Sequence, residues 1–166
     1  MMKYALKKFV EAGIAALLIS AIGVTPSSAT TAGWTVYYRS ELPYYPRCAS
    51  GQATYTIYSG PYAGSGKCGT GHTNVYWRNG DVQRQHTFVI APGGSAWNAV
   101  HTMNWRTGVT ISASGWKSLG GANLTQGIHI PWAPNPSFVN LVGGTTTGGQ
   151  FCNQLRNNAW TGWFGC

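Results

Sequence analysis

The chain has 166 residues, of which 11 are Lys or Arg and three are Asp or Glu, giving a formal net charge of +8 at pH 7. So few carboxylates leave little choice for hydrolytic machinery that depends on paired acids. Aromatic residues make up 13% of the chain and four residues are Cys.

The N-terminal segment has the order of a secretion signal. Three lysines among the first eight residues precede the apolar run Ala12–Val24, and Pro26 and the small residues 27–29 follow it. That order predicts a signal peptide cleaved after Ala29. The apolar run is shorter than the roughly 20 residues that a retained membrane span needs. We therefore expect a secreted, extracellular protein in which residues 30–166 form one domain without stable membrane insertion.

The predicted mature chain is basic. Its acids are Glu41 and Asp81, and eight basic residues give it a net charge of +6. The basic residues are Arg39, Arg47, Lys67, Arg78, Arg84, Arg106, Lys117 and Arg156. A positive field favours anionic partners such as cell-wall polymers, acidic proteins, nucleic acid or membrane surfaces. The alternative is that this charge only keeps a secreted protein soluble.

The four cysteines, Cys48, Cys68, Cys152 and Cys166, predict two disulfides in an oxidising compartment. Three pairings are open, and the short loops favour Cys48–Cys68 and Cys152–Cys166. A zinc site is the competing interpretation, but these spacings lack the close cysteine pairs that zinc sites use. We expect no metal and no cofactor.

Short apolar and β-branched runs separated by Gly, Pro, Asn and Ser predict an all-β fold, an antiparallel sandwich or small barrel stapled by two disulfides. The expected strands are Trp34–Arg39, Ala53–Tyr58, Thr73–Arg78, Val82–Ile90, Ala99–Trp105, Val109–Ala113, Gly127–Ile130 and Phe138–Val142.

Three local signals refine this expectation. Asn79-Gly80 predicts a type I′ turn that joins its two flanks as a hairpin. Pro134-Asn135-Pro136 predicts an extended or turning connection. The segment Gln150–Trp160 is the one place where a short helix is expected.

Two carboxylates would have to meet for glycosidase chemistry, and they would be Glu41 and Asp81. Asp81 follows the predicted turn, where it is expected to serve the turn itself or to pair with Arg78. Glu41 precedes Leu42-Pro43 and is expected at the surface. The sequence therefore gives no catalytic carboxylate pair.

Histidines offer a second catalytic route, in which His72, His86, His101 or His129 act as acid and base in a nuclease, with Arg84 or Arg106 steadying phosphate charge. No motif marks such a set. The segment Gly64–Cys68 resembles a phosphate loop only superficially, because Pro61 stands in place of its first glycine and Cys68 in place of its hydroxyl residue. We assign no catalytic residue.

Aromatic content is the conspicuous feature, with eight Trp and nine Tyr. Exposed rings stack on sugars or anchor protein interfaces. Tyr37-Tyr38 and the tyrosines at 44, 45, 58 and 62 lie around Pro-rich and Gly-rich turns, which favour the surface, but burial of these rings in the core is an equal alternative. Trp34, Trp77 and Trp105 are expected in the core. The candidate binding residues are Tyr44, Tyr45, Tyr55, Tyr58, Tyr62, Trp160 and Trp163, with Arg39, Arg47 and Lys67 supplying charge.

Three classes of function remain. The favoured one is a non-catalytic binding protein for an extracellular polysaccharide or cell-envelope polymer, which a row of exposed aromatics would support. The second is a secreted hydrolase inhibitor or basic antimicrobial protein with a protein target, which one protruding apolar loop would support. The third is a small His/Arg enzyme of the nuclease type, which two histidines converging in a cleft would support; nucleic acid is the least favoured partner.

Overall fold

The computed structural model describes residues 33–40, 42–121 and 123–166. The predicted signal peptide and Glu41 lie outside the described residues. The described residues form twelve strands and no helix, which confirms the all-β prediction. The strands are β1 Thr35–Arg39, β2 Thr54–Ser59, β3 Tyr62–Lys67, β4 His72–Asn79, β5 Val82–Ile90, β6 Ala96–Asn104, β7 Thr110–Gly120, β8 Gln126–Asn135, β9 Phe138–Gly144, β10 Gln150–Arg156, β11 Ala159–Trp160 and β12 Phe164–Gly165.

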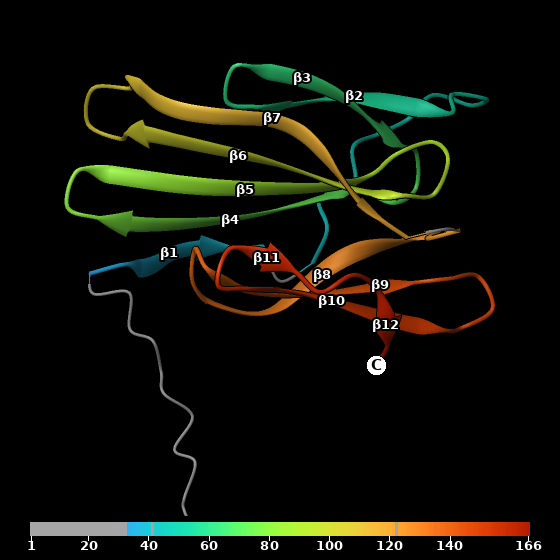
Figure 1. Ribbon diagram of the computed structural model, residues 1–166. Coiled ribbons are helices and arrows are strands. Elements are labelled where there is room, and N and C mark those ends of the chain that lie inside the picture. The colour runs from blue at the N-terminus through green and yellow to red at the C-terminus, as the bar shows by residue number, and fades with distance from the viewer. Residues whose placement is uncertain (1–32, 41, 122) are drawn as a thin grey trace, which may run out of the picture.

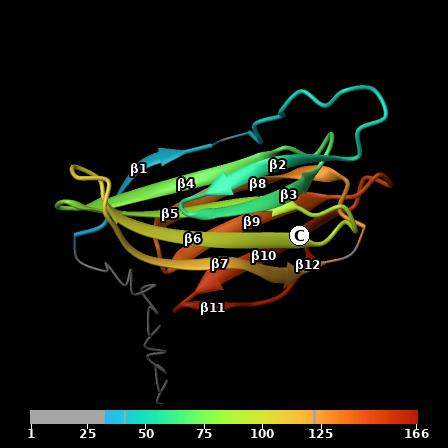
Figure 2. The ribbon, with the colours of Figure 1, turned by 90° about the horizontal axis from the view of Figure 1, so that it is seen from above.

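The strands build three layers (Figure 1). The first sheet has the antiparallel order β1-β4-β5-β6-β7, and the second has the order β11-β10-β9-β8 with β12 also paired to β10. The β2-β3 hairpin forms a separate third layer that lies on the first sheet, on the side away from the second (Figures 1 and 2). The first sheet is therefore covered on both faces.

The main core lies between the two sheets. Alternation along β4 sends Val75 and Trp77 inward, and β5 adds Phe88 and Ile90, all four fully buried. The second sheet contributes Ile128, Ile130, Ala133, Val139, Leu141 and Leu155, and the connection between β7 and β8 adds Leu124. Because both faces of the first sheet are covered, Val89 is buried too, in a smaller cluster under the hairpin with Tyr55 and Ile57.

The β4-β5 hairpin is present, but its turn lies one residue later than predicted. Asn79 pairs with Val82, so the two loop residues are Gly80 and Asp81. Gly80 has φ +57°, whereas neither Asn79 nor Asp81 has a positive φ. A single positive φ at the first loop position is the pattern of a type II′ turn, so the predicted type I′ turn is wrong here.

The prediction of a short helix in Gln150–Trp160 is wrong, because this segment forms β10 and β11. A type I′ turn joins these two strands. Asn157 and Asn158 have φ of 51° and 66° and join β10 to β11 as a two-residue loop. Asparagine tolerates this left-handed conformation better than most residues.

Two further differences concern strand limits. The unpredicted β3 contains Gly64 and Gly66, which weaken a strand signal. Both are required by packing, because an added Cβ would overlap the rings of Trp116 and Tyr55. The predicted connection at residues 134–136 begins inside β8, which ends at Asn135. β8 tolerates prolines because it is an edge strand and because its pairing with β9 shifts in register.

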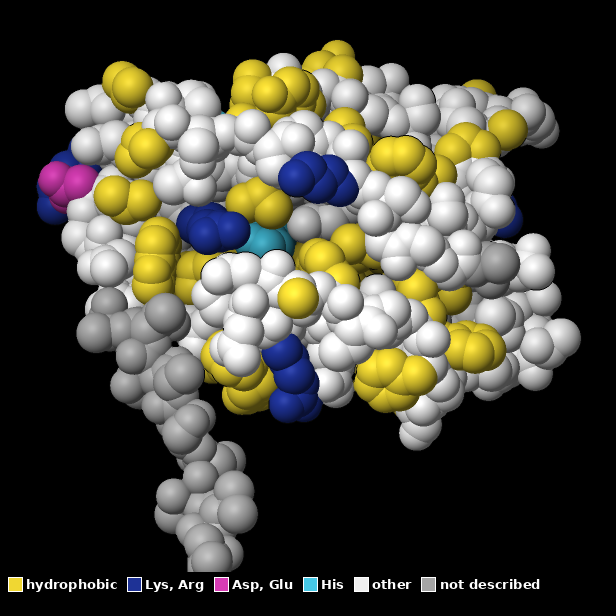
Figure 3. Space-filling view, in the orientation of Figure 1, with side chains coloured by type: hydrophobic (Ala, Val, Ile, Leu, Met, Phe, Trp, Pro, Cys, Tyr) yellow, Lys and Arg dark blue, Asp and Glu magenta, His cyan; other side chains and the backbone are white. Residues whose placement is uncertain are grey.

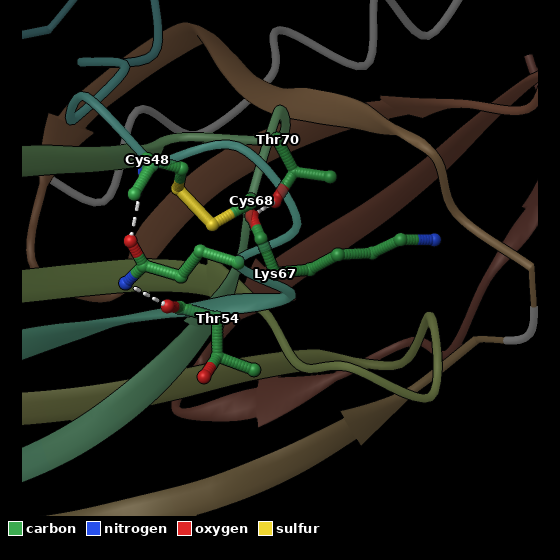
Figure 4. Close-up of a disulfide and its surroundings, with 7 residues drawn as sticks. Cys48, Thr54, Lys67, Cys68 and Thr70 are labelled. Atoms are coloured by element: carbon green, nitrogen blue, oxygen red, sulfur yellow. Dashed lines mark hydrogen bonds between the residues drawn. A yellow bond between two sulfur atoms is a disulfide. The ribbon is translucent and has the colours of Figure 1, made fainter.

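Both predicted disulfides are confirmed, Cys48–Cys68 and Cys152–Cys166. The first ties the segment before β2 to the end of β3 (Figure 4). Beside it, Gln52 accepts a hydrogen bond from the Ala49 N–H at 2.9 Å and donates one to the Thr54 carbonyl at 2.5 Å. The disulfide therefore fixes the base of the hairpin layer.

Removing this bond by a Cys48→Ala/Cys68→Ala double substitution is expected to lower the free energy of unfolding by about 3 kcal/mol, because the unfolded chain regains the freedom of a closed loop. Urea unfolding at equilibrium measures the change. The matched control is Cys152→Ala/Cys166→Ala, whose sequence separation is 14 residues instead of 20, so it is expected to cost slightly less. An unchanged unfolding midpoint in the first variant would contradict the prediction.

Candidate functional site

A line of exposed tyrosines runs along the outer face of the first sheet, beside the hairpin layer. After β1, the chain continues along β4 as far as Tyr44, which forms a bridge with His72. Tyr37, Tyr38 and Tyr44 are 61%, 50% and 64% exposed. We call these three residues the tyrosine strip.

Each ring of the tyrosine strip rests on a side chain of β4. Tyr38 lies 5.4 Å from the ring of Tyr76, and Tyr44 meets His72 edge-on at 5.2 Å. Burial, and then the neighbouring Tyr38, raise the pKa of Tyr76, while burial lowers the pKa of His72. Tyr76 and His72, which lie beneath Tyr38 and Tyr44, are therefore neutral near pH 7.

Stacked cations stand at one end of the tyrosine strip. The Arg78 guanidinium lies 3.5 Å from the Tyr37 ring and 4.1 Å from the Trp105 ring. Arg106 stacks on Trp105 at 4.7 Å and bonds Asp81 at 2.5 Å. The predicted pairing of Asp81 with Arg78 is therefore wrong, because Arg78 donates instead to Gln83 at 2.9 Å. This stack holds the Tyr37 end of the tyrosine strip in place. The Tyr37 side chain nevertheless stays exposed.

The three tryptophans that were expected in the core differ in burial. Trp77 is fully buried, and Trp34 packs partly against the core cluster. Trp105 is half-buried and lies outside the core, where its indole N–H donates to the Gly80 carbonyl at 3.1 Å. Trp105 therefore closes the β4-β5 turn.

The other predicted binding residues are spread over the molecule. Tyr45 and Arg47 are exposed between β1 and β2, close in sequence to Tyr44. Tyr58 and Tyr62 are exposed on the hairpin layer, at 72% and 39%. Half-buried Lys67 ends β3, and half-buried Arg39 donates to the Pro131 carbonyl at 2.8 Å. The structure brings only part of the predicted set to one surface.

Tyr55 is not an exposed aromatic residue, and the prediction that it presents its ring to a partner is wrong. It is 6% exposed because β2 alternates, with Tyr55 and Ile57 facing the first sheet and Tyr58 facing outward. Burial raises its pKa, so the hydroxyl stays protonated.

The two predicted tryptophans near the C-terminus lie elsewhere again. Trp163 packs against the core, and its buried indole N–H has no hydrogen-bond partner. Trp160 meets Phe88 edge-on at 5.9 Å and also lines a cleft between the two sheets. Neither belongs to the tyrosine strip.

This inter-sheet cleft has a volume of about 470 Å³. It opens where β6 and β7 extend beyond the second sheet, whose β8 packs against β1, β4 and β5 on the other side. Figure 3 shows a hollow in the middle of this face, with a histidine side chain between basic ones. The lining consists of Arg84, His86, Asn98, Val100, Thr102, Ser112, Ala113, Ser114, Lys117, Ser118, Leu119, Leu155, Asn158 and Trp160.

The cleft was not predicted from the sequence, although β5 carries a signal for it. Alternation places Arg84 and His86 on the same side as Phe88 and Ile90, so polar residues stand on the core-facing side of the strand. A basic residue in an inward-facing series indicates an opening or a site.

A second missed feature lies on the outer face of the second sheet. Trp132 is 53% exposed and meets Phe138 edge-on at 6.4 Å. A shallow pocket of about 170 Å³ beside them is also lined by Asn140, Gln154 and Arg156. The indole of Trp132 offers a sugar-stacking surface that is remote in sequence from the tyrosine strip.

The four histidines occupy different environments. His86 faces the inter-sheet cleft, His72 lies under Tyr44, His101 hydrogen-bonds Thr110 at 3.0 Å, and His129 lies on β8. Within residues 33–40, 42–121 and 123–166, no three His, Cys, Asp or Glu side chains come together as a metal site. In the same ranges, no helix has the length and hydropathy to cross a membrane.

Neither protein-family models, nor curated proteins, nor solved structures match this chain. Function must therefore be argued from the geometry of its own surfaces.

Proposed function

We propose that the chain is a secreted, non-catalytic binding protein that holds an extracellular polysaccharide or cell-envelope polymer on the tyrosine strip. The observation that carries the proposal is the alignment of exposed Tyr37, Tyr38 and Tyr44 along one side of β4. The two disulfides are consistent with an extracellular location.

The dimensions of the tyrosine strip suit an extended polymer. The rings rest on Arg78, Tyr76 and His72, which span six residue steps of β4. At roughly 3.4 Å per residue the strip is about 20 Å long. Tyrosine rings supply apolar faces for sugar rings, and their hydroxyls donate and accept hydrogen bonds with sugar hydroxyls.

A binding role also agrees with the carboxylates of the described residues. Asp81 is the only Asp or Glu side chain among them, and it is exposed and paired with Arg106. A glycosidase would need a second carboxyl group roughly 5 to 10 Å away. The described part of the chain therefore supports holding a polymer rather than cleaving it.

The inhibitor alternative receives less support from the disulfide-closed segment. That segment folds flat on the first sheet as the hairpin layer, with Tyr55 and Ile57 turned inward. It presents Tyr58 outward. The loop between β1 and β2 extends beyond the sheets in Figure 2, but its part within this segment, residues 49–53, carries no aromatic or large aliphatic side chain. The enzyme alternative receives less support, because the inter-sheet cleft contains only His86 among the histidines and the pocket beside Trp132 contains none.

The test is retention of the oxidised protein on insoluble chitin, cellulose, starch and peptidoglycan at low and high salt. Ring stacking predicts salt-resistant retention on one polymer, because it does not depend on counterions. Retention that salt abolishes, or no retention on any polymer, would overturn the proposed function and favour the inhibitor and antimicrobial alternatives.

Substitutions of exposed aromatic residues test where on the protein the polymer binds. Tyr38→Ala and Tyr44→Ala are each expected to weaken binding to the retained polymer roughly tenfold, since a lost ring contact costs on the order of 1 kcal/mol or more. Trp132→Ala is the matched control, as it removes an exposed ring from the other sheet. Tyr58→Ala/Tyr62→Ala tests the hairpin layer. Loss of binding in either of these two variants, with full binding in the tyrosine strip variants, would exclude the strip.

A further inference from the structure

The inter-sheet cleft carries positive charge that no acidic side chain of the described residues neutralises. Arg84 and Lys117 line it, and no Asp or Glu among the described residues does. The one described acidic side chain, Asp81, is bonded to Arg106. Two cations therefore face one concave site without a counter-ion from residues 33–40, 42–121 or 123–166.

Arg84 is the more informative of the two cations. Burial lowers its pKa, and its Nε is a buried donor without a hydrogen-bond partner. A guanidinium stays charged in proteins, and leaving a donor of this kind unpaired is costly. A carboxylate or sulfate oxygen supplies the missing charge-assisted hydrogen bond.

The rest of the lining suits a polyhydroxylated ligand. Hydroxyl and amide side chains come from β6, from β7 and from the turn between β10 and β11: Asn98, Thr102, Ser112, Ser114, Ser118 and Asn158. Trp160 adds a ring to the wall. His86 is 1% exposed, and neither of its ring nitrogens has a hydrogen-bond partner. This mixture of a few cations, many hydroxyls and one indole matches the functional groups of a charged sugar.

We infer that the inter-sheet cleft binds an acidic saccharide, with Arg84 and Lys117 receiving its carboxylate or sulfate group and the hydroxyl and amide side chains bonding its ring hydroxyls. The volume of about 470 Å³ lies within the roughly 300–1,000 Å³ of small-ligand sites. The site is separate from the tyrosine strip, and the inference does not depend on the proposed function.

A single-stranded nucleic acid is the other anionic partner to consider. Proteins that bind it place several aromatic side chains along a basic groove, so that successive bases stack. Trp160 is the one Trp, Tyr or Phe in the described lining. The lining therefore favours the saccharide.

The direct test titrates the oxidised protein calorimetrically with trigalacturonate, its methyl ester and a sulfated heparin disaccharide. The ester keeps the sugar rings and removes the charge. We expect trigalacturonate or the sulfated disaccharide to bind at least ten times more tightly than the ester, and the stronger of the two identifies the anionic group. Equal binding of acid and ester, or no binding of either acid, would overturn the inference.

Variants of the lining residues test whether the acidic ligand binds in the inter-sheet cleft. Arg84→Gln is expected to weaken binding of the acidic ligand at least tenfold, and Lys117→Gln several-fold; Lys117 is exposed, so that variant tests the cleft without a core change. Arg47→Gln is the matched control, because it removes the same charge from an exposed site between β1 and β2. Equal losses in all three variants would show attraction by bulk charge only and overturn the inference.

Two further measurements separate the alternatives. Tyr38→Ala/Tyr44→Ala is expected to retain trigalacturonate binding even where it loses the insoluble polymer, so either site can fail alone. Binding of a single-stranded DNA oligonucleotide that depends on Arg84, without binding of either acidic saccharide, would replace the saccharide with nucleic acid.

Discussion

Replacing Trp77 with Ala is expected to lower the free energy of unfolding by about 3–5 kcal/mol, the usual cost of removing a buried large aromatic side chain. The indole is 0% exposed between the two sheets, and its N–H donates to the Ala133 carbonyl of β8 at 2.9 Å. The substitution leaves a cavity and also an unpaired buried carbonyl. Equilibrium urea unfolding, followed by far-ultraviolet circular dichroism, measures the loss.

Trp105→Ala is the matched control for this prediction. It removes the same side chain from a half-buried position outside the core, where the indole donates to Gly80. We expect a loss of about 1 kcal/mol, the size of one hydrogen bond. Equal losses in the two variants would show that Trp77 does not fasten one sheet to the other.

Local patterns in the sequence were sufficient for much of the fold. Apolar and β-branched residues in 82–90, bounded by turn-forming residues on both sides, predicted β5 with its correct limits. The short separations of the cysteines predicted both disulfides, since close pairs in a small β chain are easily brought together.

Elements that depend on tertiary contacts were not predictable in this way. β3 carries two glycines that a strand normally avoids, and they are required only because Tyr55 and Trp116 occupy the space beside them. Likewise, β10 has little alternation in composition, and pairing with β9 along its whole length makes it a strand. Neither fact is local to the segment concerned.

The candidate sites show the same division. Turn-rich surroundings left surface and core equally open for Tyr44, Tyr45, Tyr58 and Tyr62, and the structure shows that all four are exposed. The burial of Tyr55 follows from the hairpin layer, which the sequence did not predict. The inter-sheet cleft depends on a difference in width between two sheets, and this difference is set by strand order rather than by any motif.

Acid is expected to destabilise this protein chiefly through its histidines, because the whole chain has only three Asp or Glu residues. His86 is the strongest case. Burial, and then the neighbouring Arg84, lower its pKa to about 3 in the folded protein, against 6.5 for an unperturbed histidine. His72 and His101 are shifted in the same direction by burial.

The sign of the effect follows from linkage. Above pH 6.5, His86 is neutral in both states and does not change stability. Between pH 6.5 and about 3, the unfolded chain binds a proton that the folded protein refuses, so the free energy of unfolding falls as pH falls. At roughly 1.4 kcal/mol per pH unit the loss amounts to a few kcal/mol over this window.

His86→Leu tests the assignment, because leucine removes the titrating ring and its two unpartnered nitrogens while keeping an apolar side chain in the site. We expect urea unfolding midpoints of this variant to decline much less between pH 6.5 and 4 than those of the unmodified protein. His72→Gln is the matched comparison; it removes a half-buried ring and is expected to reduce the decline less. A His86→Leu variant with undiminished acid sensitivity would move the effect to the other histidines. Unfolding midpoints of His86→Leu that do not change between pH 6.5 and 4 would instead assign the acid response of the fold to one buried ring at the inner end of the inter-sheet cleft.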